Sequence, residues 1–165
     1  MHIILFYGLR RSGNHAILNL FIKGYKNYVH INDVKELDYE EFNKNAMIPI
    51  TVTDIDRKYT GFLKTDLVII SMENKLPNYD VINKIQESYE NVYVFMLLRN
   101  PINHLSSAWT EYKNNKKNIF NEIKKLWIEY SKIIIKNDNK INYIIYDKFY
   151  SNEDYRINIL KKNKY

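Results

Sequence analysis

Apolar residues along this chain occur in two patterns, which together predict the order of its secondary-structure elements. Short continuous apolar runs are typical of strands buried in a parallel sheet, whereas apolar residues three or four positions apart are typical of amphipathic helices. The continuous runs predict strands over Met1–Tyr7, Tyr28–Ile31, Leu67–Ile70 and Val92–Leu98. Helical spacing follows the first run at Ala16, Ile17, Leu20 and Phe21, and it recurs over Asp80–Tyr89 and after Pro101. Strands and helices are therefore expected to alternate.

The region between the second and third of these strands has a weaker pattern. It is predicted to contain a polar helix or irregular piece at Glu36–Asn45, an extended piece at Ile48–Thr53 and a surface segment at Asp54–Thr65. Every connection between predicted strands is helical or long, which favours parallel pairing with helices on both faces of the sheet. We therefore expect one α/β domain over residues 1–165, with three α/β/α layers around a central parallel sheet.

The connection after the first strand is a loop bounded by glycines. It runs from Gly8 to His15 and contains two of the four glycines of the chain, Gly8 and Gly13. Glycines let the backbone turn sharply and expose its N–H groups, and a following helix adds the positive end of its dipole, so the loop is a candidate anion site. Because strand, loop and helix come in P-loop order, the fold is expected to be P-loop NTPase-like. An ordinary βα turn with solvated arginines is the alternative.

The residues after the second glycine differ from those of a nucleoside triphosphate site. Such a loop continues with a lysine for the outer phosphates and a hydroxyl residue for magnesium. Here Asn14 and His15 occupy those positions, and the positive charge lies upstream at Arg10 and Arg11. Histidine is a poor ligand for a hard, oxygen-preferring cation. We therefore expect an anionic ligand that is not a magnesium triphosphate.

A second motif begins where the most hydrophobic strand ends. Arg99 follows that strand, Asn100 suits a helix N-cap and Pro101 suits the first helical position. Arg99 should then lie at the carboxyl edge of the sheet, where open α/β folds bind ligands, and Ser107 can approach the same space from the helix. A guanidinium and a hydroxyl together suit one phosphate. Alternatively, Arg99 pairs with a carboxylate and Ser107 only packs.

Two apolar stripes are predicted to face the core from the helices that follow. The first comprises Ile102, Leu105, Trp109 and Tyr112, and the second comprises Ile119, Ile123, Leu126, Trp127, Tyr130, Ile133 and Ile134. At helical spacing, aromatic residues belong to a core more often than to a binding site. We therefore interpret both tryptophans as core residues.

Composition narrows the class of protein. The 165 residues are 45% hydrophobic and contain no cysteine, so the chain can form a core but neither a disulfide nor a thiolate zinc site. The net charge of +6 is spread along the sequence among many Asn, Ile and Tyr residues, which makes nucleic acid an unlikely partner. No apolar run approaches the roughly 20 residues needed to span a bilayer. A cytoplasmic protein is expected.

Taken together, the two motifs resemble those of the sulfotransferase family. In that family, a P-loop-like segment holds the 5′-phosphosulfate of 3′-phosphoadenosine 5′-phosphosulfate (PAPS), and a second strand–helix junction holds its 3′-phosphate. Arg11–His15 is similar to the family's loop, and Arg99-Asn100-Pro101 with Ser107 is similar to its Arg-x-Pro motif with a serine eight positions after the arginine. Similarity to the bacterial-type branch extends to Leu9–His15, Ser71-Met72-Glu73, Ile141–Tyr146 and Asp154-Tyr155-Arg156. It covers most of the chain outside Asp33–Thr65.

The resemblance implies an enzyme that transfers a sulfuryl group from PAPS directly to an acceptor hydroxyl or amine, without a metal. The implied nucleotide-binding residues are Gly8, Arg10, Arg11, Ser12, Gly13, Asn14, His15, Arg99 and Ser107. Arg11 and His15 would also stabilise charge in the transition state. Glu73 follows a central strand and is the candidate general base, with a solvated carboxylate as the alternative. His15 and then His30 are other candidates for the base, and His104 is interpreted as structural.

Two departures from the family pattern bear on activity. Arg11 stands where the family usually has lysine, which keeps the charge but does not readily donate a proton. Relatives continue into a glycine-containing basic segment that covers the nucleotide, and nothing after Leu160 resembles it, so a truncated or minimal version is expected. Two other functions stay open, namely a P-loop nucleotide kinase and a non-catalytic module that binds nucleotide or nucleic acid. The sequence does not identify the acceptor or the oligomeric state.

Overall fold

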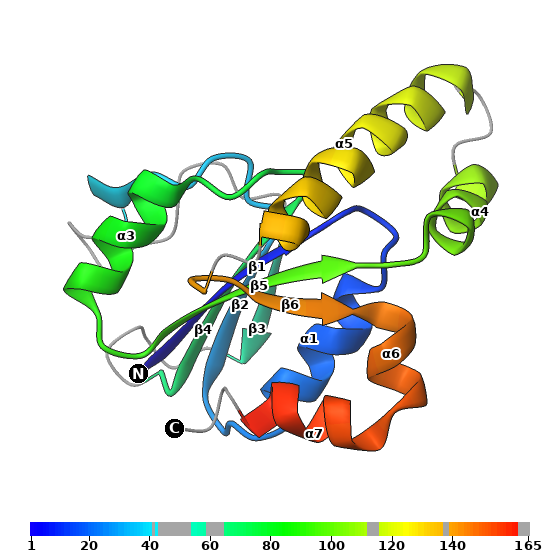
Figure 1. Ribbon diagram of the computed structural model, residues 1–165. Helices are drawn as coiled ribbons and strands as arrows, with labels where there is room; N and C mark the ends of the chain where they lie inside the picture. The colour runs from blue at the N-terminus through cyan, green and yellow to red at the C-terminus, as the bar shows by residue number, and fades with distance from the viewer. Residues whose placement is uncertain (41, 43–53, 59–64, 112–115, 137–138, 162–165) are drawn as a thin grey trace.

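A computed structural model describes residues 1–40, 42, 54–58, 65–111, 116–136 and 139–161. They form a six-stranded sheet in the order β3-β2-β4-β1-β5-β6, with helices on both faces (Figure 1). The strands are β1 (His2–Gly8), β2 (Tyr28–Asn32), β3 (Asp54–Lys58), β4 (Leu67–Glu73), β5 (Val92–Leu98) and β6 (Asn142–Ile145). The helices are α1 (Asn14–Ile22), α3 (Tyr79–Ser88), α4 (Pro101–Glu111), α5 (Lys116–Lys136), α6 (Tyr146–Ser151) and α7 (Glu153–Lys161). All neighbouring strands pair in parallel except β2 and β3.

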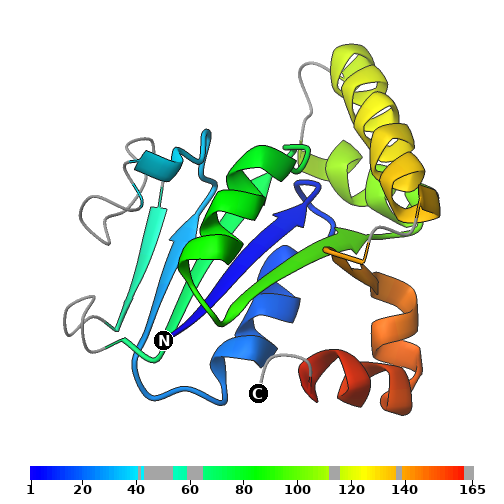
Figure 2. The same ribbon diagram turned by 60° about the vertical axis from the view of Figure 1, so that its left-hand side comes forward.

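The alternation of side chains along the strands divides the core into two layers. Ile3 and Leu5 of β1 belong to a cluster that includes residues of α3 and α5, whereas Ile4 and Phe6 belong to a cluster with residues of α1, α6 and α7. Successive strand residues point to opposite faces, so a strand apolar at every position must be covered on both sides. Figures 1 and 2 show the two groups of helices on opposite faces of the sheet. The predicted three-layer α/β/α fold with a central parallel sheet is confirmed.

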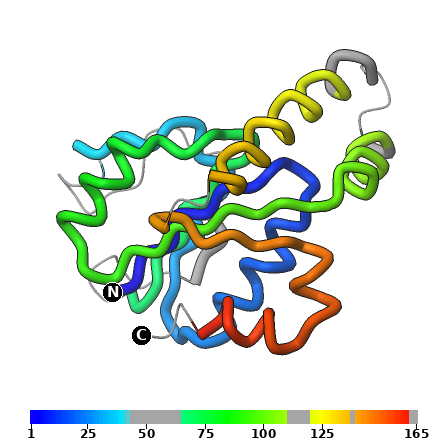
Figure 3. Tube along the Cα trace, viewed as in Figure 1, coloured from blue at the N-terminus to red at the C-terminus, as the bar shows by residue number. Residues whose placement is uncertain are grey.

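The register of the central strands gathers three strand ends at one edge of the sheet. Gly8, the last residue of β1, lies opposite Glu73 of β4 and Leu97 of β5. The loop after β1, the end of β4 and the segment between β5 and α4 are therefore neighbours. Figure 3 shows the chain leaving β1 and β5 toward the same side.

The edge of the sheet differs from the prediction. Asp54–Lys58 was expected to belong to a surface segment, yet it forms β3, which pairs with β2 in antiparallel fashion. The sequence Asp-Ile-Asp-Arg-Lys lacks an apolar run because an edge strand has only one neighbour, and charged residues are common there. The extended piece predicted at Ile48–Thr53 lies outside the described residues. Within the predicted polar helix, the Phe42 N–H donates to the Asp38 carbonyl at 3.1 Å, as in a helical turn.

The first helical stripe was also placed on the wrong face. Ile102 and Trp109 are 75% and 52% exposed, whereas His104 and Ala108 are buried. Tyr112 lies outside the described residues. Residues 104 and 108 are one turn apart, so α4 presents to the protein a face that contains a histidine, which a hydropathy pattern counts as polar. The α5 stripe is buried at Ile123 and Tyr130, as predicted.

No helix in the described ranges is long and apolar enough to cross a membrane.

Candidate functional site

The loop between β1 and α1 adopts a compact turn. The Ser12 N–H donates to the Leu9 carbonyl at 3.0 Å, and both Arg11 (φ 69°) and Gly13 (φ 98°) lie in the left-handed region. At Gly13 a side chain is excluded for a second reason, because a Cβ there would lie 2.2 Å from the ring of Tyr146. The second glycine of the motif is therefore required both by its backbone conformation and by its neighbour.

The first carbonyl groups of the loop are hydrogen-bonded to the protein. Four consecutive carbonyls, those of Gly8 to Arg11, accept hydrogen bonds. Their donors are, in order, the Asn74 N–H (3.0 Å), the Ser12 N–H (3.0 Å) with Asn14 Nδ2 (3.3 Å), His104 Nε2 (2.7 Å) and Arg99 Nη1 (3.2 Å). The N-cap of α1 is Gly13, which supplies no side-chain cap to the first N–H groups of the helix. With its acceptors occupied, the loop presents backbone donors, which suits an anion.

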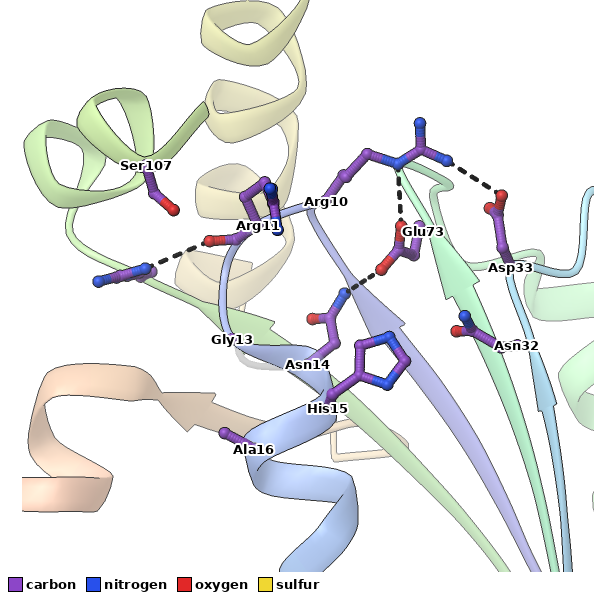
Figure 4. Close-up of a pocket in the computed structure, with 11 residues that line it drawn as sticks. Arg10, Arg11, Gly13, Asn14, His15, Ala16, Asn32, Asp33, Glu73 and Ser107 are labelled. Carbon is purple, nitrogen blue, oxygen red and sulfur yellow. Dashed lines mark hydrogen bonds and ion pairs between the residues drawn. The ribbon is translucent and has the colours of Figure 1, made fainter. Parts of the chain in front are cut away.

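These donors open onto a polar cavity of about 590 Å³. It is lined by Arg10, Arg11, Gly13, Asn14, His15, Ala16, Asn32, Asp33, Glu73, Arg99 and Ser107. In Figure 4, Arg11 and Ser107 lie on one side of the loop, while Arg10 extends to the other side toward Asp33. The structure thus brings together the loop and both residues of the second predicted motif. Gly8 and Ser12 are not among the lining residues.

On the β4 side of the cavity, Arg10 is held between two carboxylates. Its Nε lies 3.0 Å from Glu73 Oε2 and its Nη2 lies 3.0 Å from Asp33 Oδ2, and Lys35 forms a further ion pair with Asp33. The Arg10 N–H also donates to Asn74 Oδ1 at 2.9 Å. The charge of Arg10 is therefore shared with the acidic residues that follow β2 and end β4, and it links the loop to both strands.

Asn14 braces the loop from inside. Its Nδ2 donates to Glu73 Oε1 (3.1 Å) and to the Leu9 carbonyl, and its Oδ1 accepts from Ser12 Oγ (2.8 Å). A Cβ at Gly8 would approach Asn14 Oδ1 to 1.9 Å, so the first glycine makes room for this amide. Asn14 therefore occupies the position that lysine has in a nucleoside triphosphate loop, but its side chain is hydrogen-bonded to groups of the protein itself.

On the β5 side, Arg99 is fixed by contacts on three of its groups. Its Nη1 donates to the Arg11 carbonyl, its guanidinium lies 4.7 Å from the ring centroid of Tyr146, and its own carbonyl accepts from Trp127 Nε1 at 3.0 Å. Its Nε is buried and has no hydrogen-bond partner among the described residues. A buried donor without a partner is costly.

The helix that follows Arg99 begins as predicted. Asn100 Oδ1 accepts from the N–H groups of Ile102 (2.9 Å) and Asn103 (3.4 Å), which confirms the N-cap. The Asn100 N–H donates to Asp147 Oδ2 at 3.2 Å, which ties this junction to the start of α6. Ser107 lies on the same helix and lines the cavity.

Three of the four histidines lie near the loop, each in a different environment. His15 is exposed at the start of α1 and lines the cavity, and its ring centroid lies 5.9 Å from that of buried His30, whose Nε2 contacts Ser71 Oγ at 3.0 Å. His104 is fully buried. Burial lowers the pKa of His104, its hydrogen bond to the Arg10 carbonyl raises it, and the charge of Arg99 lowers it, with a net shift downward.

Asn32, Asp33 and Tyr146 lie at this site but were not among the site residues predicted from the sequence. Each ends a parallel strand or follows it directly, at the same edge as the loop. The rule that ligands bind beyond the carboxyl ends of such strands would have selected them. Among the described residues, no three side chains of metal-ligating type lie together.

Comparisons with known proteins found similarity only at the level of structure. No protein-family profile matches the chain, and no curated protein matches it in sequence. The structure is similar to mouse sulfotransferase SULT7A1 in complex with PAP (TM-score 0.51, 16% identity), with 98% of this chain and 57% of that chain covered. It is similar to a sulfotransferase from Alicyclobacillus acidocaldarius (TM-score 0.51, 10% identity), with 98% and 78% covered. A shikimate kinase from Bacteroides thetaiotaomicron has a TM-score of 0.49 at 12% identity, with 87% and 84% covered.

The two sulfotransferases establish the fold of this chain as sulfotransferase-like. The chain spans little more than half of the mouse protein, 57% of its length.

Proposed function

We propose that this protein is a sulfotransferase that uses PAPS as donor and transfers its sulfuryl group to an acceptor hydroxyl or amine. The main observation in support of this proposal is that the loop with its backbone donors and the pair Arg99 and Ser107 line the same cavity. A ligand with two separate phosphate groups suits two separate anion sites. The fold neighbour SULT7A1 was determined with PAP bound, which supports the same class of ligand here.

Each half of the cavity has a role in this proposal. The backbone donors from Gly13 to Ala16 and the charge of Arg11 would hold the 5′-phosphosulfate. Arg99 and Ser107 would hold the 3′-phosphate with the guanidinium and the hydroxyl that line the cavity. Arg10 and Asn14 would act through the loop and Glu73, because their side chains are directed there.

The transfer itself is an in-line displacement at sulfur. The acceptor oxygen or nitrogen forms a bond to sulfur as the bond from sulfur to the bridging oxygen breaks, and the electron pair of that bond stays on the departing phosphate. Arg11 would stabilise this charge electrostatically, since a guanidinium does not readily give up its proton. The acceptor's proton must pass to a base.

Glu73 is the residue we assign to that step. One of its carboxylate oxygens accepts from Arg10 Nε and the other from Asn14 Nδ2, so the carboxylate has a fixed orientation at the cavity wall. Each oxygen retains a further lone pair for the acceptor proton. His15, exposed on the same wall, is the alternative base.

Isothermal titration calorimetry tests the proposal. Binding of 3′-phosphoadenosine 5′-phosphate (PAP), the product of the donor, is expected in the presence of EDTA, and it should be much tighter than binding of 5′-AMP, which lacks the 3′-phosphate. No heat with PAP combined with magnesium-dependent binding of ATP would overturn the proposal in favour of a kinase. Salt-sensitive binding of oligonucleotides without competition by PAP would overturn it in favour of a nucleic-acid module.

A further inference from the structure

His104 lies inside the protein and is hydrogen-bonded to the loop through one of its ring nitrogens. It is 0% exposed, and its Nε2 lies 2.7 Å from the carbonyl oxygen of Arg10. A carbonyl oxygen only accepts, so Nε2 carries the proton and Nδ1 of the neutral ring carries a lone pair. Nδ1 is buried and has no hydrogen-bond partner in the described part of the chain. A proton on Nδ1 would therefore create a buried donor with nothing to accept from it.

The bond from His104 is one of two that reach the loop from the β5–α4 junction. Arg99 donates to the Arg11 carbonyl, and His104 donates to the carbonyl one residue earlier. In a trans peptide, the carbonyl and the following N–H point in opposite directions, so fixing these two carbonyls fixes both peptide planes that flank Arg11, immediately before the loop reaches Gly13. Arg11, between these two peptides, has φ 69°, a conformation that a non-glycine residue keeps only where its surroundings hold it.

We propose that His104 is a positioning residue that holds the loop in its anion-binding conformation and joins it to the Arg99–Ser107 half of the cavity. It does not line the cavity, so it acts through the Arg10 carbonyl. The identity of the bound anion rests on the proposed function, but the effect on the loop does not. Burial lowers the pKa of His104, which agrees with a neutral ring.

Two substitutions separate positioning from mere packing. His104→Gln keeps an N–H donor at similar reach, whereas His104→Leu keeps the volume and removes the donor. Ile85→Val, in the buried face of α3 away from the cavity, is a matched control for a mild loss of core packing. Amide hydrogen exchange of residues 10–13 in the ligand-free protein and calorimetric titration with PAP are measured for all four proteins.

In His104→Leu, exchange of the loop amides is expected to rise about tenfold and PAP affinity to fall about tenfold, the size of one buried hydrogen bond left unmade. His104→Gln should recover most of both, and Ile85→Val should change neither. Wild-type loop exchange in His104→Leu, or equal defects in the Leu and Gln variants, would overturn the proposal. If the wild type does not bind PAP, the proposed function fails while the exchange data still decide the role of His104.

If His104→Leu does not fold, the wild type itself provides the test. Long-range ¹⁵N–¹H correlation spectra of the imidazole are expected to show the Nε2–H tautomer, protected from exchange, in the ligand-free protein. An imidazole that carries its proton on Nδ1, or exchanges rapidly, would contradict the hydrogen bond on which the inference depends.

Discussion

The two flanks of the cavity use an arginine in opposite ways. On the β4 flank, the guanidinium of Arg10 lies between Glu73 and Asp33 at 3.0 Å from each. On the β5 flank, the guanidinium of Arg99 rests on the ring of Tyr146 and donates to a backbone carbonyl, with its Nε left buried and unpartnered among the described residues. One positive charge is balanced by carboxylates, and the other is held in place by groups that carry no charge.

This difference shows that the number of arginines near a loop does not by itself indicate how strongly the loop attracts an anion. An arginine paired with two carboxylates adds no net positive charge to the cavity. An arginine that contacts only an aromatic ring and a carbonyl keeps its positive charge available to attract an anion. The β5 flank is therefore expected to be the stronger anion site, and under the proposed function the acceptor and the base lie on the β4 flank.

The largest effect is expected from removing the arginine of the β5 flank. Arg99→Ala should weaken PAP binding about 100-fold, because a half-buried, hydrogen-bonded charge is lost from the proposed 3′-phosphate site. Arg99→Lys should be intermediate, since lysine keeps the charge but not the fork of donors. Calorimetry measures both. Arg156→Ala is the matched control, because Arg156 also donates to a backbone carbonyl but lies on α7, outside the cavity. Equal losses in the Arg99→Ala and Arg156→Ala proteins would refute the comparison.

A smaller effect, about tenfold, is expected from Arg10→Gln, and it should be indirect. Without Arg10, the charge of Glu73 faces the cavity uncompensated and repels an anion, whereas Asp33 keeps its ion pair with Lys35. Adding Glu73→Gln should therefore return PAP affinity to within about threefold of the wild type. If Arg10 instead contacted the ligand, the double variant would bind as weakly as Arg10→Gln alone. Lys132→Gln, which breaks the exposed pair with Glu129 on α5, provides the control.

Removing the hydroxyl of the β5 flank is expected to have a still smaller effect. Ser107→Ala should weaken PAP binding about three- to tenfold, the usual range for one hydrogen bond, with no change in 5′-AMP binding. The neighbouring exposed Ser106 does not line the cavity, so Ser106→Ala should bind PAP like the wild type. An equal loss of 5′-AMP affinity in Ser107→Ala would indicate that Ser107 contacts the 5′-phosphate and not the 3′-phosphate.

The smallest effect concerns pH and stability. The pKa of His104 is lowered in the folded protein, so below about pH 6.5 the unfolded chain binds more protons than the folded one, and stability falls as the pH falls. One such group contributes at most about 1.4 kcal/mol per pH unit, and nothing at higher pH, where both states are neutral. Urea unfolding between about pH 5 and pH 7.5 should show this slope in the wild type and a shallower one in His104→Gln. Because His2 also has a lowered pKa, some slope should remain in both proteins, and parallel curves would contradict the assignment.

The central strands could be predicted from the sequence because burial on both faces leaves a continuous apolar run. The prediction for Val92–Leu98 matches β5, and that for Leu67–Ile70 falls inside β4. The edge strand Asp54–Lys58 could not be found in this way, since it is held by backbone pairing along one side only. The wrong face of α4 has a different cause. The buried His104 is hydrogen-bonded to a carbonyl 94 positions earlier in the chain. A hydropathy pattern counts histidine as polar and contains no information about such a distant partner.

For the site, the sequence indicated which residues gather but not what each one contacts. Spacing placed Arg99 and Ser107 at the same edge as the loop, and both line the cavity with Arg11 and His15. It treated Arg10 and Arg11 alike, because the pairing of Arg10 depends on carboxylates that lie 23 and 63 positions away. Such distinctions require the register of the sheet, which local patterns do not contain.

The most direct test of a two-phosphate site is a crystal structure of the protein with PAP. The account predicts the 5′-phosphate at the N–H groups of Gly13 to Ala16 and the 3′-phosphate within hydrogen-bond distance of the Arg99 guanidinium and the Ser107 hydroxyl. A nucleotide whose 3′-phosphate lies away from Arg99, or against Arg10 on the β4 flank, would contradict it.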